Sequence, residues 1–220
     1  MKDKIIIGVA TFAGREKALA KMLESIEKQT IQVDLIFIYD NEHSPDLTDN
    51  GKFRYLEKIT EPSYYFSMDD DLYYSKTYIE DMIKAIDEYQ TIVTHHGRRL
   101  RGPGRNYYFG HKQFTCLDHN GPLKTIDVAG TGVTAFHTSY FNPVDIWKSE
   151  DKKMSDCVFS LEAAKQGKII TVLPHERGYI TQLEVDAATS CYETQRDNPV
   201  RQSWYADEIC KIKNIENPKK

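Results

Sequence analysis

Three consecutive aspartates, Asp69, Asp70 and Asp71, form the segment of this chain whose residue types most directly suggest chemistry. They follow an apolar run with the pattern of a buried strand, and alternate side chains of an extended backbone point the same way. We therefore expect Asp69 and Asp71 to share one face, while Asp70 points elsewhere. Mg²⁺ and Mn²⁺ prefer oxygen ligands and commonly bind through one or two carboxylates together with substrate phosphates. The triplet thus predicts a divalent cation beside a nucleotide diphosphate.

Two other interpretations of the triplet compete with a nucleotide-associated metal site. An aspartate cluster can cap a helix or occupy a turn without binding anything. An EF-hand loop that starts at Asp69 would place Glu80 at its twelfth position, but Tyr74 stands where the sharp turn requires glycine. We discount the calcium loop and keep the plain turn as the alternative.

A second candidate segment is rich in arginine. Its arginines are Arg98, Arg99, Arg101 and Arg105, and the aromatic residues Tyr107, Tyr108 and Phe109 follow them. The glycines and the proline of this stretch predict a loop that is mobile or ordered for function. Arginine binds phosphates through paired hydrogen bonds, so the loop could hold a donor diphosphate. It could also contact a DNA backbone while the aromatic rings stack on a base, or it could be a solvated surface loop.

The Gly130-Thr131-Gly132 segment is the third candidate. Glycine lets the backbone approach a ligand closely, so this turn could leave room for a sugar. A hairpin or bulge turn would explain the same residues without a ligand. A dinucleotide-binding fingerprint can be placed on Gly130, Gly132 and Ala135, but the residues that follow alternate like a strand and open no helix.

The elements expected around the aspartates alternate between strand and helix, which is typical of βαβ units on a largely parallel sheet. Strands are expected at 5–10, 33–39 and 64–68, and an amphipathic helix at about 15–28. Another helix follows Ser75 or Thr77, with Glu80 completing a capping box on Thr77. The triplet should then lie between a strand and a helix, at the sheet edge where ligands of open α/β folds bind.

The second half of the chain is less regular. Strands are expected at 91–95, 125–129, 133–137 and 168–173. Ser155 or Asp156 is expected to cap a helix that stops at Gly167. From about residue 185 the pattern weakens, and this tail is interpreted as a lid or a packed extension. With no internal repeat, residues 1–220 are expected to form one domain of the α/β class.

Composition limits the function. The chain has 220 residues, a net charge of −4 and 40% hydrophobic residues, which is ordinary for a globular protein and unsuited to covering a polyanion. Its N-terminal apolar run is too short for a signal peptide, and no run is long enough to span a membrane, so we expect a cytoplasmic protein of a bacterium or a virus-infected cell. The cysteines, expected to be reduced and mostly buried, are Cys116, Cys157, Cys191 and Cys210.

The order of several segments resembles the glycosyltransferases of the GT-A fold. These segments are GVATFAGREKALAKMLESIEKQ, LIFIYDNE and YYFSMDDDLYYSKTYIEDM, followed by THHGRRL, DVAGTGVTAFHTS and MSDCVFSLEAAKQGK. The later ones are similar to a small family-two-like subgroup of bacteria and large viruses. The resemblance implies a Rossmann-like, mostly parallel sheet flanked by helices, with an Asp-x-Asp motif that holds the metal and the nucleotide.

The resemblance also implies roles for single residues. Asp71 would bind the metal directly, and Asp69 would contact the ribose or a metal-bound water. The residues matched to the nucleotide site are Thr11, Phe12, Arg15, Asp40 and Asp70, and Asp156 matches the acid that deprotonates the acceptor in inverting relatives. His175 stands where some relatives have a third metal ligand, and Arg98 matches an active-site position. Tyr39 to Glu42 replace the usual Asp-Gly-Ser, so base recognition departs from the family.

The activity that the resemblance implies is transfer of a sugar from a nucleotide sugar, with a UDP-sugar as the expected donor and Mn²⁺ or Mg²⁺ as cofactor. Retention or inversion at the anomeric carbon stays open, and Asp156 would orient substrate in a retaining reaction. A glycan is the first acceptor, and hydroxymethylated pyrimidine in phage-type DNA, contacted by the arginine loop, is the second. A nucleotidyltransferase would usually have a glycine-rich loop after its first strand, and TFAGRE has one glycine. A noncatalytic carbohydrate-binding module would need neither metal nor nucleotide.

Overall fold

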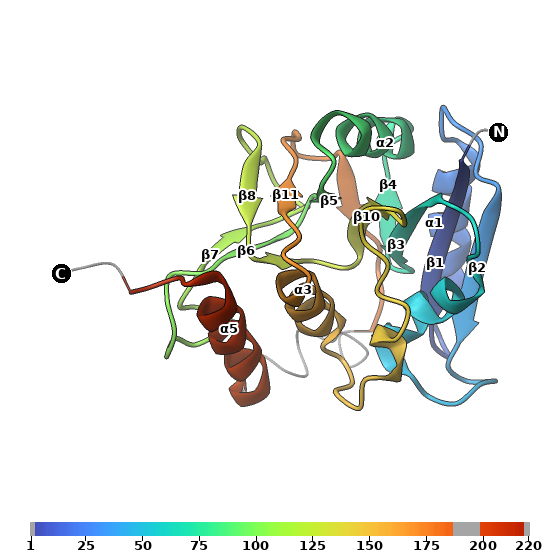
Figure 1. Ribbon diagram of the computed structural model, residues 1–220. Coiled ribbons are helices and arrows are strands. Elements are labelled where there is room, and N and C mark those ends of the chain that lie inside the picture. The colour runs from blue at the N-terminus through green and yellow to red at the C-terminus, as the bar shows by residue number, and fades with distance from the viewer. Residues whose placement is uncertain (1–2, 187–198, 218–220) are drawn as a thin grey trace.

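The computed structural model describes residues 3–186 and 199–217. A seven-stranded sheet runs through the centre, with helices on both faces (Figure 1). In spatial order its strands are β2 (Leu35–Asp40), β1 (Lys4–Thr11), β3 (Ser63–Asp69), β10 (Val133–His137), β5 (Ile92–Thr94), β11 (Ile170–Val172) and β8 (Lys124–Ile126). Strands β2, β1 and β3 are mutually parallel, as are β5 and β11, whereas β10 and β8 run antiparallel to their neighbours. The α/β class and the mostly parallel sheet expected from the sequence are confirmed.

Strand β1 lies inside this sheet, and its residues from Ile5 to Thr11 are all buried. Successive strand side chains point to opposite faces. Ile7 accordingly packs with Met22 in one apolar cluster, while Ile6 packs with Phe53 in another. A run of β-branched residues suits this position because a parallel strand is covered on both faces.

The helices divide between the two faces. One face carries α1 (Glu16–Glu27) and α2 (Tyr78–Tyr89), and the other carries the 3₁₀ helices η1 (Thr48–Lys58) and η2 (Ile146–Lys148) together with α3 (Ser155–Lys165). Helix α5 (Val200–Lys213) packs beside α3 through a third apolar cluster (Figure 1). This part of the tail is therefore a packed extension. Residues 187–198 of the same prediction lie outside the described residues.

Two smaller sheets border the main one. Strand β6 (Gly97–Arg99) lies between β7 (Lys112–Phe114) and β9 (Val128–Ala129), and β12 (Ile180–Gln182) pairs with β4 (Leu72–Tyr74). The prediction of a loop from residue 95 onward is thus wrong at β6. A β carbon on Gly97 would lie 2.2 Å from the carbonyl oxygen of Val128, so glycine allows the close pairing of β6 with β9.

Two local predictions around α2 need correction. The aspartates do not lead directly into that helix, because β4 intervenes. The capping box is also wrong: Thr77 occupies the N-cap position without a side-chain hydrogen bond. Glu80 instead accepts a hydrogen bond from Thr30 and pairs with Lys84. The carboxylate is held by a loop and by its own helix, and does not reach back to the cap.

The remaining sequence expectations concern cysteines and membranes. Cys116, Cys157 and Cys210 are free and buried, as predicted, and Cys191 lies outside the described residues. Within the described ranges, no helix has the length and apolar character needed to cross a bilayer.

Candidate active site

A pocket of about 520 Å³ opens where β1 and β3 end. Ligand sites commonly have volumes of roughly 300–1,000 Å³. The predicted site residues that line it are Phe12, Arg15, Asp69, Asp70, Asp71, Arg98, Gly130, Thr131, Gly132 and Asp156. The predicted residues outside its lining are Thr11, Asp40, His175, Arg99, Arg101 and Arg105. The fold thus brings five separate segments of the candidate list into one cavity.

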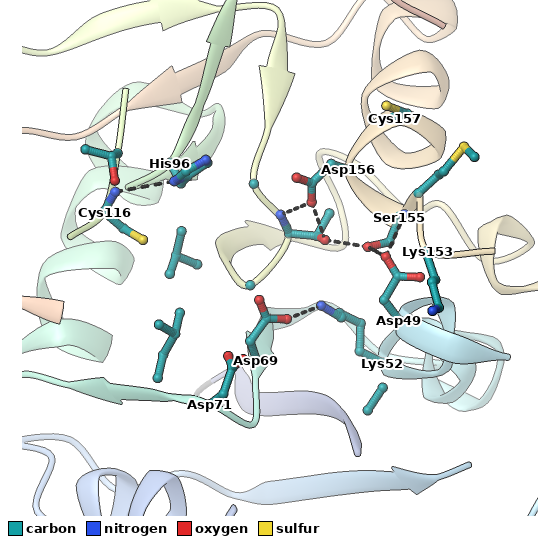
Figure 2. Close-up of a pocket in the computed structure, with 18 of the residues that line it drawn as sticks. Asp49, Lys52, Asp69, Asp71, His96, Cys116, Lys153, Ser155, Asp156 and Cys157 are labelled. Carbon is teal, nitrogen blue, oxygen red and sulfur yellow. Dashed lines mark hydrogen bonds and ion pairs between the residues drawn. The ribbon is translucent and has the colours of Figure 1, made fainter. Parts of the chain in front are cut away.

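Asp69 and Asp71 lie side by side at the floor of this pocket (Figure 2). The carboxylate of Asp69, 40% exposed, forms an ion pair with Lys52, which extends from η1 and is only 3% exposed. Gly132 stands directly against Asp69: a β carbon there would lie 1.9 Å from Asp69 Oδ2. The glycine therefore makes room for the aspartate side chain as well as for any ligand in the pocket.

Asp70 also lines the pocket, and it is the most deeply buried member of the triplet. It is buried, accepts a hydrogen bond of 2.7 Å from Thr11 Oγ1, and pairs at 2.7 Å with Arg15 Nη1. The same nitrogen lies 2.9 Å from Asp71 Oδ2. Thr11 and Arg15, expected to meet the nucleotide, thus hold the acidic turn itself.

The charge at the floor stays negative, because three carboxylates face two cationic side chains. Burial, followed by the negative charge of Asp69, raises the pKa of Asp71 to about 6. Burial alone would lower the pKa of Lys52, but Asp69 and Asp49 raise it. Neighbouring oxygen ligands with uncompensated charge fit a hard divalent cation.

His175 is not brought to the aspartates. It lies after β11, 8% exposed, with its Nδ1 atom 3.2 Å from Nδ1 of His95. The ring also packs edge-on against His95 and lies near Tyr179. The proposed third metal ligand is therefore part of a buried histidine and tyrosine cluster in this structure.

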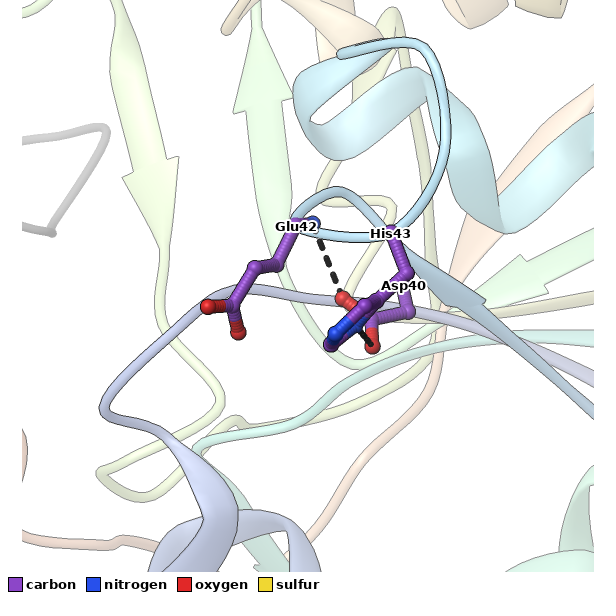
Figure 3. Close-up of side chains that lie close together, drawn as sticks. All are labelled: Asp40, Glu42 and His43. Carbon is purple, nitrogen blue, oxygen red and sulfur yellow. Dashed lines mark hydrogen bonds and ion pairs between the residues drawn. The ribbon is translucent and has the colours of Figure 1, made fainter.

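Asp40 ends β2 outside the pocket lining. It forms a small surface group with Glu42 and His43, in which Asp40 accepts a 2.9 Å hydrogen bond from the Glu42 backbone and contacts His43 Nδ1 at 2.7 Å (Figure 3). Within the described ranges, this is the one group of three potential ligand side chains whose atoms lie within 4.8 Å of one another. The hydrogen bond from the Glu42 backbone N–H to Asp40 is typical of an aspartate that stabilises its own turn. This turn explains why the three side chains lie together, and no bound ion is needed.

Asp156 lies in the pocket wall, in the first turn of α3. Neither it nor Ser155 caps the helix, because Met154 occupies the N-cap position and no side chain bonds there. Asp156 Oδ1 instead accepts two 2.7 Å hydrogen bonds, from the backbone N–H and the hydroxyl of Thr131. Burial raises the pKa of Asp156, although the bonds from Thr131 oppose the shift. Its carboxylate is thus tied to the Gly130-Thr131-Gly132 turn.

Arg98 is the one arginine of its segment that lines the pocket, together with Tyr107 and Tyr108. Its side chain is 4% exposed, and its guanidinium lies 4.4 Å from the centre of the Tyr107 ring and 5.4 Å from that of Tyr108. The Nε atom is buried and has no hydrogen-bond partner in the described part of the chain. An arginine that is desolvated and stacked in this way is suited to bind an anionic ligand.

The other arginines are used differently. Arg99 donates two hydrogen bonds, of 3.1 and 2.6 Å, to the carbonyl of Thr125. Arg105 donates to the carbonyl of Arg101 and to Asn217. These exposed side chains brace β6 and the segment after it, and the structure does not gather them around Arg98.

Lys52, Asp49 and Ser155 are pocket residues that the sequence interpretation missed. Lys52 and Asp49 lie on η1, between the strands expected at 33–39 and 64–68. The available signal was the position of Lys52 next to Phe53 and four residues before Leu56. That spacing puts the lysine on the buried side of a helix. Its partner Asp69 comes from another element, so the ion pair could not be found from spacing.

The sheet, with its pocket at the carboxyl ends of β1 and β3, has the GT-A architecture expected from the sequence resemblance. No protein-family model matches the chain, and none of the curated proteins matches it in sequence. The fold is similar to crystal structures of TarS from S. aureus. The complex with UDP-GlcNAc aligns with a TM-score of 0.54 and 15% identity over 84% of this chain and 59% of that chain. The complex with UDP has a TM-score of 0.51 and 13% identity over 96% and 71%. The chain therefore spans about three fifths of the first TarS chain.

Proposed function

We propose that this protein is a glycosyltransferase that transfers a sugar from a nucleotide sugar and depends on Mn²⁺ or Mg²⁺. The observation that carries the proposal is that Asp69 and Asp71 line the same pocket as Asp156 and Arg98. Two oxygen ligands, one carboxylate base and one desolvated cation are the groups that such a transfer needs. We take residues 1–220 as one GT-A domain, and the cytoplasm remains our expected location.

The donor we propose is a UDP-sugar. The TarS structures that share this fold were crystallised with UDP-GlcNAc and with UDP, and the pocket volume is suitable for a ligand of that kind. Phe12 and Arg98 line the pocket and are our candidates for contacts with the nucleotide and its diphosphate.

We assign the metal to Asp71 and Asp69. A divalent cation bound there would neutralise the charge that builds on the departing diphosphate. Arg98 would contribute a second positive charge, since no carboxylate pairs with it among the described residues. Arg15 and Lys52 hold the aspartates in place through their ion pairs.

We assign Asp156 as the base of an inverting transfer, in which it accepts the proton of the acceptor hydroxyl. The acceptor we favour is a glycan. The DNA alternative needs a grouped arginine surface, but Arg98 is buried and Arg99 is bonded to the backbone of Thr125. A nucleotidyltransferase would need a basic loop after β1 that binds phosphates. The arginine at that place, Arg15, pairs with Asp70 and Asp71 instead.

Calorimetric titration of UDP with and without Mn²⁺ tests the proposal. In the native protein and in the surface control Asp46→Ala, we expect UDP to bind only when Mn²⁺ is present. In Asp71→Ala, we expect Mn²⁺ no longer to increase the affinity for UDP. Asp156→Asn should keep UDP binding but lose transfer from radiolabelled UDP-GlcNAc, with glycans and hydroxymethylated DNA offered as acceptors to see where the label goes. Metal-independent or absent UDP binding, or a fully active Asp156→Asn, would contradict the assignment.

A further inference from the structure

A chain of short hydrogen-bond contacts joins two carboxylates in the pocket wall (Figure 2). The Ser155 hydroxyl lies 2.6 Å from Asp49 Oδ2 and 2.7 Å from the Thr131 hydroxyl. The Thr131 hydroxyl in turn lies 2.7 Å from Asp156 Oδ1. We call this series Asp49, Ser155, Thr131 and Asp156 the carboxyl chain. It connects η1 to α3 through the turn before β10.

The carboxyl chain has more contacts than its hydroxyls have hydrogens. Each of the three oxygen pairs needs one hydrogen between its atoms, and Ser155 and Thr131 supply one each. Their backbone N–H groups cannot fill the gap, because they already donate to the end carboxylates, at 2.9 Å to Asp49 and 2.7 Å to Asp156. With both carboxylates ionised, two oxygens would face each other without a hydrogen. One added proton on the pair completes all three bonds.

The surroundings make a shared proton reasonable. Thr131 and Ser155 are buried, at 1% and 2% exposure, so water does not supply the missing hydrogen readily. Burial also raises the pKa of Asp156. The titratable and charged groups that act on Asp156 are Lys52 from η1, Asp69 from β3, Arg98 from β6, and Tyr107, Cys116 and Cys157. Lys52 also faces Asp49, which is only partly buried.

We propose that Asp49 and Asp156 share a single proton through the hydroxyls of Ser155 and Thr131, and that this sharing fixes the position of the Asp156 carboxylate in the pocket. The catalytic use of the chain rests on the proposed transferase function; the sharing itself does not. Asp49, Ser155 and Thr131 are then positioning residues, which keep Asp156 ionised and direct a hydroxyl at its Oδ1. Neither of the hydrogen bonds to Asp156 uses Oδ2, and that oxygen is left for the acceptor.

In the starting state Asp49 carries the shared proton and Asp156 is ionised. The acceptor hydroxyl gives its proton to Asp156 while its oxygen bonds to the sugar, and the bond from sugar to diphosphate breaks with its electron pair leaving on UDP. The pair now holds two protons. The proton from the acceptor lies on Oδ2, outside the three contacts, and leaves to water after the product departs, while Asp49 keeps the shared proton.

Infrared spectroscopy of the free protein tests the sharing without any turnover. We expect a C=O band of a protonated carboxyl near neutral pH that is lost in both Asp49→Asn and Asp156→Asn, because a shared proton needs both ends. Asp46→Asn, which removes an exposed carboxylate from the same turn region, should keep the band. A band that survives in Asp49→Asn, or its absence in the native protein, overturns the proposal.

Hydrolysis of UDP-GlcNAc by water tests the catalytic use. An asparagine at position 49 can still donate to Ser155 and imitate the protonated carboxyl, whereas alanine cannot. We expect Asp49→Ala to lower kcat by about tenfold or more, the factor for one hydrogen bond to a charged group, with KM unchanged and with substantial rescue in Asp49→Asn. Equal kcat for Asp49→Ala and the native protein refutes the positioning role. If UDP-GlcNAc is not hydrolysed at all while the infrared result holds, the proton sharing stands and the proposed function fails.

Discussion

Gly132 and Asp69 are in such close contact that a β carbon at position 132 would lie 1.9 Å from Asp69 Oδ2 and 2.3 Å from its carboxyl carbon. The turn before β10 therefore fixes where the first aspartate of the triplet can lie. Because Lys52 holds the other side of that carboxylate, its position depends on η1 as well as on β10.

Gly132→Ala should accordingly displace Asp69 and weaken metal-dependent UDP binding. We expect a Kd for UDP in the presence of Mn²⁺ that is about 10- to 100-fold higher, the range found when support of a metal ligand is lost. Gly121→Ala is the matched control, since a β carbon there meets nothing within 4 Å. If Gly132→Ala binds UDP in the presence of Mn²⁺ as tightly as the native protein does, Asp69 is not a ligand of the metal.

Lys52→Met tests the buried ion pair. The substitution keeps much of the side-chain volume but leaves Asp69 without its cation, and breaking a fully buried pair typically costs about 3–5 kcal/mol. Asp69 is 40% exposed and can recover hydration, so we expect a smaller loss of about 1–3 kcal/mol in the free energy of unfolding by urea. Lys58→Met, on an exposed position of the same η1, should change it by less than about 0.5 kcal/mol. Equal stabilities of the two variants would show that the pair contributes little.

Arg98→Met tests the cation in the pocket. Methionine fills part of the space beside Tyr107 and Tyr108 but cannot donate to a diphosphate, so we expect UDP affinity to fall by about 1.5–3 kcal/mol. Arg99→Met, one position further along β6, removes an exposed side chain bonded to Thr125 and should leave the affinity unchanged. If both substitutions lower the affinity for UDP by a similar amount, the effect comes from a less stable β6, and Arg98 does not contact the ligand.

His95 predicts a dependence of stability on pH. Burial, and then the neighbouring His175, lower its pKa from 6.5 to about 3, so the folded state holds the ring neutral while the unfolded state takes up a proton below pH 6.5. The stabilisation is fully present above pH 6.5 and is lost as the pH falls from 6.5 toward 3, by up to about 1.4 kcal/mol per pH unit.

Urea unfolding between about pH 7 and pH 5 measures this slope. His95→Gln should flatten it, and His119→Gln, at an exposed position, should leave it as in the native protein. Identical slopes in the native protein and in His95→Gln would contradict the buried neutral histidine.

The first half of the fold was predictable from the sequence because its elements are long enough to show a period. The apolar run of β1 and the spaced apolar residues of α1 and α2 give clear patterns, and the structure confirms these elements. Strands β4, β6 and β12 have three residues each, which is too short for alternation to show. Helix α5 was missed because its buried residues mix Gln202 with apolar side chains, which weakens the helical pattern.

Part of the candidate site was predictable for a similar reason. The triplet at the end of β3 is a local signal, and its position at the sheet edge follows from the order of elements. The contacts of Asp156 with Thr131 and of Lys52 with Asp69 join segments 25 and 17 residues apart. His175 was misplaced because a position after a strand does not reveal which neighbouring ring a histidine meets. Such pairings depend on tertiary packing, which no local pattern records.

The pairing of β4 with β12 has a consequence for how the site is made. The carbonyl of Asp71 accepts hydrogen bonds from the Leu183 backbone and from the side chain of Gln182, so the acidic turn is closed by a segment that lies 111 residues further along the chain. During synthesis, the aspartates emerge from the ribosome long before the residues that secure them. A nascent chain that ends before β12 would contain every proposed metal ligand but would lack the two hydrogen bonds that hold Asp71 in position.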